Sequence, residues 1–122
     1  MSVSAAEVVE LVAETLGVPP EVASRRPGVG RPSDRASIFR AVAASLLRRH
    51  LALPWAEVAE EIGLATAESA TKAAARCRRR CAAGEDVSVR VGGRRSVRPL
   101  RDVVLVLDAE LDRRRRRGKG AA

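Results

Sequence analysis

One stretch constrains the fold of this chain more than any other: residues 53–80 contain two helical patterns separated by a glycine, LPWAEVAEEIGLATAESATKAAARCRRR. Gly63 is placed to end the first helix in a left-handed conformation, and Thr66 is placed to cap the second. The first helix has an apolar side made of residues at helical spacing, namely Trp55, Val58, Ala59 and Ile62. We therefore expect two short helices joined by a tight turn.

The second helix divides into two faces when residues are placed at about 100° intervals. A narrow inner stripe of small residues consists of Ala70, Ala74, Cys77 and Cys81. The opposite face carries Glu68, Ser69, Lys72, Arg76, Arg79 and Arg80. This pattern is typical of a helix-turn-helix, whose second helix enters the DNA major groove. Because the apolar phase begins at Ala70, we expect a turn about one residue longer than the tightest form of the motif.

An ordinary αα-hairpin of a helical bundle has the same apolar pattern, so charge is needed to choose between the two interpretations. The chain has 23 Lys and Arg against 15 Asp and Glu, a formal charge of +8, as expected of a polyanion binder. All the basic residues except Lys72 and Lys119 are arginine, which suits bidentate phosphate and guanine contacts but also follows from a GC-rich genome. Aromatic residues make up 2%, which argues against base-stacking single-strand binders and favours duplex DNA.

Composition argues against an enzyme, a metal site and a membrane protein. With only two thiols and a single histidine, the chain offers a poor zinc site, so Cys77 and Cys81 are expected to be inward-facing reduced cysteines. His50 follows two arginines at a helix end and is expected to act as a capping cation. We expect no cofactor or small-molecule substrate, and a soluble, cytoplasmic protein. Four C-terminal carboxylates alternate with arginines and are expected to form a solvated face: Asp102, Asp108, Glu110 and Asp112.

The N-terminal half predicts two further helices. Ser4 and Glu7 form a capping box for a helix that runs to Leu16 and closes at Gly17. Residues 19–22 suggest a short helical turn, and residues 24–32 form a Gly/Pro loop with three arginines that can reach a minor groove. A long helix capped by Ser33 then has the longest apolar stripe of the chain and is expected to be the central core helix, through Ile38, Phe39, Val42, Ala43, Leu46 and Leu47.

The C-terminal part is less regular. Val87, Val89 and Val91 alternate with polar residues before Gly92 and Gly93, as in a short strand or extended segment. From Leu100 the apolar spacing favours a helix, although the run VVLVL in residues 103–107 fits a buried strand as well. We expect a helix-turn-helix domain over residues 1–83, an extension packed on the same core over 84–112, and a basic disordered tail over 113–122.

Residues 8–79 resemble the C-terminal DNA-binding domain of the bacterial replication initiator DnaA. The likeness lies in LGV at residues 16–18, the basic loop from Ser24 to Arg31, the long helix RAVAASLLRR at 40–49, and EVAEEIG at 57–63. The resemblance implies a mainly α fold, a small Trp-repressor-like helical bundle with a helix-turn-helix, here with an extra C-terminal helix. It also implies that Arg25, Arg26 and Arg31 of the loop enter the minor groove.

The chain departs from this family at two points. The recognition-helix signature Arg-Asp-His-Thr-Thr is replaced by Ala-Thr-Ala-Glu-Ser at residues 65–69, so the usual initiator box is not the expected target. No phosphate-binding loop of an ATPase domain is present in the sequence. The chain therefore resembles a stand-alone relative of the domain, and a similar domain attached to transposase-like proteins is a further context.

The sequence thus predicts a double-stranded DNA-binding protein, acting in replication or transcription regulation and with no indicated oligomeric state. The expected DNA contacts are Arg25, Arg26, Arg31, Arg35 and Arg40 on the backbone or minor groove, and Thr66, Ser69, Lys72, Arg76 and Arg79 in or beside the major groove. The alternative is a protein-interaction or regulatory module with a degenerate helix-turn-helix, which Ala65 and Ala67 favour. Structured-RNA binding is less favoured, because RNA folds of that kind usually have a sheet or an aromatic face.

Overall fold

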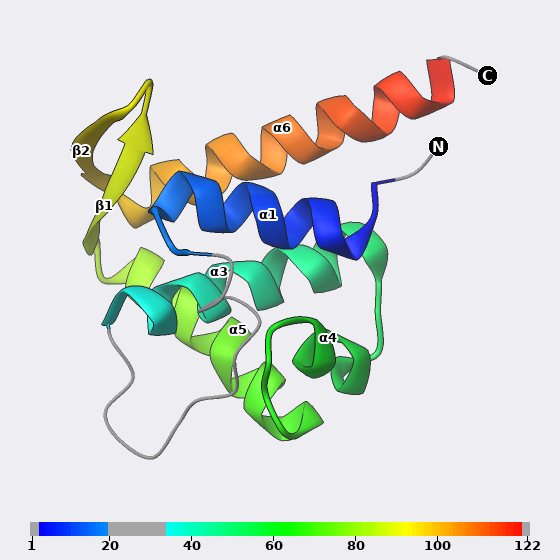
Figure 1. The fold of residues 1–122 in the computed structure, drawn as a ribbon. Coiled ribbons are helices and arrows are strands. Elements are labelled where there is room, and N and C mark those ends of the chain that lie inside the picture. Colours follow the sequence, from blue (N-terminus) through cyan, green and yellow to red (C-terminus); the bar gives the residue numbers. More distant parts are fainter. Residues whose placement is uncertain (1–2, 20–33, 121–122) are drawn as a thin grey trace.

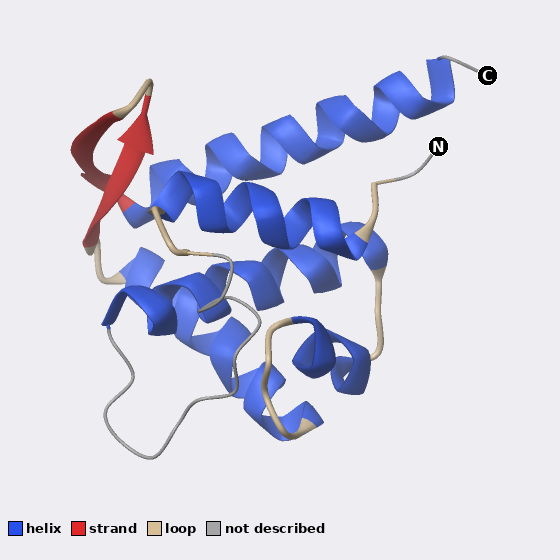
Figure 2. Ribbon diagram, in the orientation of Figure 1, coloured by secondary structure: helices blue, strands red, loops and turns tan. Residues whose placement is uncertain are grey.

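The described residues form a bundle of helices with one two-stranded sheet. A computed structural model describes residues 3–19 and 34–120, and Figure 1 shows how their elements are arranged. Helix α1 (Ala5–Leu16) contacts α3 (Asp34–Leu51), which is followed by α4 (Trp55–Glu61) and α5 (Ala67–Ala82). A hairpin of β1 (Asp86–Val91) and β2 (Arg94–Pro99) leads into α6 (Leu100–Gly120). The prediction of a mainly helical small bundle is confirmed, with one two-stranded sheet (Figure 2).

Helix α3 is the core of the bundle, as predicted. Phe39, Val42 and Leu46 are completely buried, and α1, α4, α5 and α6 all contact this helix. The burial is wider than one apolar stripe, because Ala41 and Ala44 are also inaccessible. Because α3 is buried over most of its length, Arg40 and His50 on this helix are buried as well, whereas Arg48 and Arg49 near its end are exposed.

Helix α1 begins and ends where its capping residues indicate. The Ser4 hydroxyl accepts a hydrogen bond from the backbone N–H of Glu7 at 3.2 Å. Gly17 ends the helix with φ of 68°, a left-handed conformation that few residues other than glycine adopt readily. Val8, Val12 and Leu16 are buried, so one face of α1 covers α3.

The hairpin confirms the expected strand before Gly92 and adds a second strand that was not predicted. Gly92 and Gly93 have φ of 56° and 80°, the left-handed pair that a two-residue type I′ turn requires. Val87 and Val89 are buried. The second strand, RRSVRP, has no alternation of apolar and polar residues, so only pairing with β1 reveals it.

Residues 103–107, for which the sequence allowed a helix or a strand, belong to helix α6. Leu100, Val103, Leu107 and Leu111 are buried along one side. The helix continues to Gly120, so the predicted disorder is wrong for residues 113–120. Ion pairs one turn apart support this extension: Glu110 lies 2.7 Å from Arg113 and 3.1 Å from Arg114, and Asp112 lies 3.8 Å from Arg115.

Two predictions about polar residues on α3 and α6 are corrected. His50 was expected to cap the end of its helix, but its side chain is buried and its Nε2 lies 2.7 Å from Asp108 Oδ1 on another helix. The side chain of Asp108 is only 18% exposed, so it does not belong to a solvated face. The two residues are 58 positions apart, and only the packing of α6 against the end of α3 brings them together.

Candidate nucleic-acid interface

Helix α5 is held to the bundle by a stripe of small side chains. Ala70, Ala74 and Cys77 are at most 2% exposed, whereas Cys81, at the end of the stripe, is half-buried. Ala73 is buried beside them and widens the stripe. Since alanine and cysteine project little from a helix, α5 lies close to α3 and α4. The predicted inward face of this helix is confirmed, and its opposite face therefore points away from the core.

The connection between α4 and α5 has the local signals that the sequence indicated. Gly63 has φ of 72°, and the N–H of Leu64 donates to the Ala59 carbonyl at 2.8 Å, which closes the end of α4. The Thr66 hydroxyl then accepts from the N–H of Ser69 at 3.1 Å and caps α5. These bonds set the angle at which α5 leaves the turn and hence the direction of its outer face.

The outer face of α5 is basic. Lys72 and Arg79 are exposed, and so is Arg78, which was not among the predicted contacts. Lys72 Nζ lies 3.2 Å from Glu68 Oε1, with both side chains more than 70% exposed. Such a surface pair contributes only about 0–1 kcal/mol, so a phosphate group can replace the glutamate at little cost. Arg80 is half-buried and lies 3.4 Å from Glu85.

The predicted arginines outside α5 have different environments. Arg35, in the first turn of α3, is half-buried. Arg40 is 7% exposed, so it does not lie on the open surface as expected for a backbone contact. Burial lowers the pKa of the Arg40 guanidinium by desolvation. The three loop arginines lie outside the described residues: Arg25, Arg26 and Arg31.

A pocket of about 220 Å³ lies between α3 and α5 and joins residues of both helices. Arg76, half-buried, donates from Nη1 to the Ser37 hydroxyl at 3.2 Å across this junction. The described residues that line the pocket are Ser37, Arg40, Leu64, Ser69, Lys72, Ala73 and Arg76. Four of the polar members were predicted from the sequence, but Ser37 was not, although its place one turn before Arg40 puts both residues on one face of α3.

A second basic surface lies on the hairpin and was also missed. Arg90 on β1 is directly opposite Arg95 on β2, on the face away from buried Val87 and Val89. Both arginines are exposed, and no carboxylate in residues 3–19 or 34–120 forms an ion pair with either. Like charges opposite each other destabilise a hairpin, so this pair lowers stability unless an anion is near.

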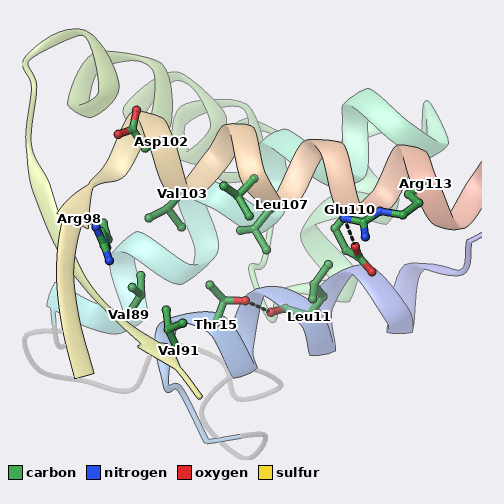
Figure 3. Close-up of a pocket in the computed structure, with 11 residues that line it drawn as sticks. Leu11, Thr15, Val89, Val91, Arg98, Asp102, Val103, Leu107, Glu110 and Arg113 are labelled. Carbon is green, nitrogen blue, oxygen red and sulfur yellow. Dashed lines mark hydrogen bonds and ion pairs between the residues drawn. The ribbon is translucent and has the colours of Figure 1, made fainter. Parts of the chain in front are cut away.

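An apolar groove separates this hairpin from α1 and α6 (Figure 3). Its volume is about 450 Å³, and Leu11, Val89 and Leu107 line it. Val91 and Val106 also line it and are 59% and 68% exposed. Arg98, Asp102, Glu110 and Arg113 give it polar margins of both signs, so it lacks the single-sign charge of a nucleic-acid site.

The described part of the chain contains no cluster of three or more histidine, cysteine or acidic residues arranged to hold a metal ion. None of its helices combines the length and apolar character needed to cross a bilayer. Comparison with protein-family models, with curated proteins and with solved structures finds no match to this chain.

Proposed function

We propose that this chain is a cytoplasmic protein that binds double-stranded DNA, with α4 and α5 acting as a helix-turn-helix in replication or transcription regulation. The observation that carries the proposal is the orientation of α5. Its small residues face α3, and its exposed side bears Lys72 and Arg79. The resemblance of the sequence to the DNA-binding domain of DnaA, in the order of basic loop, long helix and helix-turn-helix, supports the same function.

The turn at residues 62–66 directs the start of α5 outward, where a recognition helix makes its base contacts. Thr66 and Ser69 are joined at this start by a 2.9 Å hydroxyl bond, and Lys72 follows one turn later. A hydroxyl can contact any base, whereas a lysine pairs best with guanine at O6 and N7. Each well-placed pair discriminates by about 1–3 kcal/mol. Arg79 and Arg35 then contact phosphates of the DNA backbone. The proposed role is binding and includes no catalysis.

Protein binding by a degenerate helix-turn-helix is the second candidate, and a specific observation favours it. The apolar groove beside the hairpin exposes Val91 and Val106, although apolar side chains at this level of exposure gain from a partner that covers them. Enrichment of sequences from a random duplex library separates the two candidates, because a module that binds only proteins enriches none.

Salt dependence of duplex binding tests the leading proposal. If about five phosphates are neutralised, log affinity falls with log salt at a slope of roughly −4 to −5. The double variant K72Q/R79Q removes two exposed charges from α5, and its slope should be shallower by about 2. The matched control R116Q/R117Q removes two exposed charges from the far end of α6 and should change the slope much less. Equal slopes for the two double variants, or salt-independent binding, contradict the proposal.

A further inference from the structure

Helix α6 carries apolar side chains on the side that faces away from the core. Leu105 and Val106 are 58% and 68% exposed, and Ala109 is exposed as well, whereas Leu107 and Leu111 on the opposite side are buried. Figure 1 shows α6 along one edge of the bundle, so the other described elements leave its outer side uncovered. Apolar residues that are grouped on a surface in this way, and not scattered singly, indicate a site that a partner covers.

Charged residues of opposite sign stand at the two ends of this patch. Asp102, Val106, Ala109 and Arg113 are spaced i, i+4, i+7 and i+11, so they form one row within about 60° of the helix surface. The Asp102 and Arg113 side chains are 57% and 62% exposed. Figure 3 shows them at opposite ends of this segment of α6. The order along the row is therefore acidic, large apolar, small apolar and basic.

This order is complementary to itself when a second copy of α6 lies antiparallel to the first. A two-fold axis through the midpoint of the row places Asp102 of each copy opposite Arg113 of the other, because the two residues are equally far from that point along the helix. By the same count Val106 lies opposite Ala109, so a larger side chain meets a smaller one. In a parallel pair each charge faces an identical charge, which is unfavourable. The charges therefore favour the antiparallel arrangement.

The partners that both charged residues have within the chain do not prevent these pairs. Asp102 lies 3.9 Å from Arg101, and both side chains are more than half exposed, so this ion pair contributes little. Arg113 lies 2.7 Å from Glu110, which also accepts a hydrogen bond from Arg114 at 3.1 Å. Glu110 therefore keeps a cationic partner when Arg113 turns toward a second copy.

We propose that the outer side of α6 is the interface of a homodimer, in which two copies of the helix pack antiparallel. Leu105, Val106 and Ala109 of each copy form its apolar centre, and two Asp102–Arg113 pairs lie at its ends. A standard interface uses about 20–30 residues per partner, so we expect a weak dimer that is dissociated at low micromolar concentration. The inference goes beyond the proposed function and does not depend on DNA binding.

Sedimentation velocity of the full chain between about 10 and 500 µM tests for the dimer without DNA. The sedimentation coefficient should rise with concentration from that of a monomer toward that of a dimer. V106K places an ammonium group at the apolar centre and should weaken association at least about 10-fold. V97K is the matched control, because Val97 is also 68% exposed but lies on the hairpin. A parent chain that is monomeric at every concentration, or equal association of V106K and V97K, overturns the proposal.

Charge reversal tests the antiparallel geometry. D102R and R113D each place like charges opposite one another at both ends of the interface, so each variant alone should associate about 10-fold more weakly than the parent chain. In an equimolar mixture both end pairs are attractive again, because one chain has two basic ends and the other has two acidic ends. We therefore expect the mixture to form heterodimers, and the double variant D102R/R113D to associate like the parent chain.

Net charge alone predicts a different result. The chain has a formal charge of +8, and R113D lowers that charge, so general repulsion between chains would make R113D associate more strongly than the parent. Circular dichroism checks that each variant is folded, which the exposure of both side chains favours. A mixture of D102R and R113D that remains monomeric overturns the antiparallel arrangement. Single variants that associate as strongly as the parent chain overturn the role of the end pairs.

Discussion

His50 Nε2 lies 2.7 Å from Asp108 Oδ1, which joins the last turn of α3 to the middle of α6. The His50 side chain is 2% exposed, and its Nδ1 lies 3.4 Å from an Arg115 nitrogen and 4.0 Å from an Asp112 oxygen. Arg49 approaches the same Asp108 oxygen at 3.6 Å. This polar cluster and the buried Leu111 next to it on α6 attach the long C-terminal helix to the core.

Loss of the Asp108 carboxylate should destabilise the fold measurably. D108A leaves the buried imidazole without its closest partner, and an unsatisfied buried polar group costs about 1–3 kcal/mol. The free energy of unfolding in urea measures the effect. D102A is the matched control, because Asp102 lies on the same helix, is 57% exposed and pairs with Arg101 only at 3.9 Å. A loss of the same size in D102A is the result that contradicts this role of Asp108.

Enlarging the small stripe of α5 should also lower stability. A74L places three more carbons where α5 lies against the core, and overpacking of this kind typically costs about 1–3 kcal/mol. A67L, at the exposed start of the same helix, adds the same atoms to solvent and should cost little. Thermal unfolding followed by circular dichroism compares them. If A74L is as stable as A67L, the stability of the fold does not depend on close packing of α5 against α3 and α4.

Reversing one charge in the hairpin should raise stability. R95E places a carboxylate opposite Arg90 and turns a repulsive cross-strand pair into an attractive one, a gain of about 0.2–1 kcal/mol. R94E changes net charge equally, but Arg94 is opposite Val91 and has no arginine partner across the strand. Urea unfolding should show R95E to be the more stable of the two. The reverse order is incompatible with Arg90–Arg95 repulsion.

The two thiols should differ in reactivity. Burial, with the nearby Cys81 as a smaller cause, raises the pKa of Cys77 from 9.0 to about 12. The pKa of Cys77 is therefore higher in the folded chain than in the unfolded chain. The stability that comes from keeping this thiol neutral is present below pH 9 and is lost as the pH rises toward 12. Iodoacetamide at pH 8 should therefore modify half-buried Cys81 first and Cys77 only on unfolding. Equal rates in the folded protein would falsify this assignment.

Elements with local signals were predictable from the sequence. Ser4 and Gly17 mark the ends of α1, and Thr66 marks the start of α5, because capping bonds join residues only three or four positions apart. The inward faces of α3 and α5 follow from helical periodicity for the same reason. The second strand escaped prediction because its register depends on β1 and not on its own pattern.

The amino-acid order by itself determined where the helices of the described chain turn their apolar sides, since each side is encoded within a few turns of one segment. Tertiary packing decided which polar residues are exposed. The sequence alone places Arg40 at the surface, but packing of other elements around α3 buries it. The sequence alone makes His50 a helix cap, but the packing of α6 brings Asp108 to it. Burial depends on neighbours that are distant in sequence, so the pocket between α3 and α5 exists only in the folded chain.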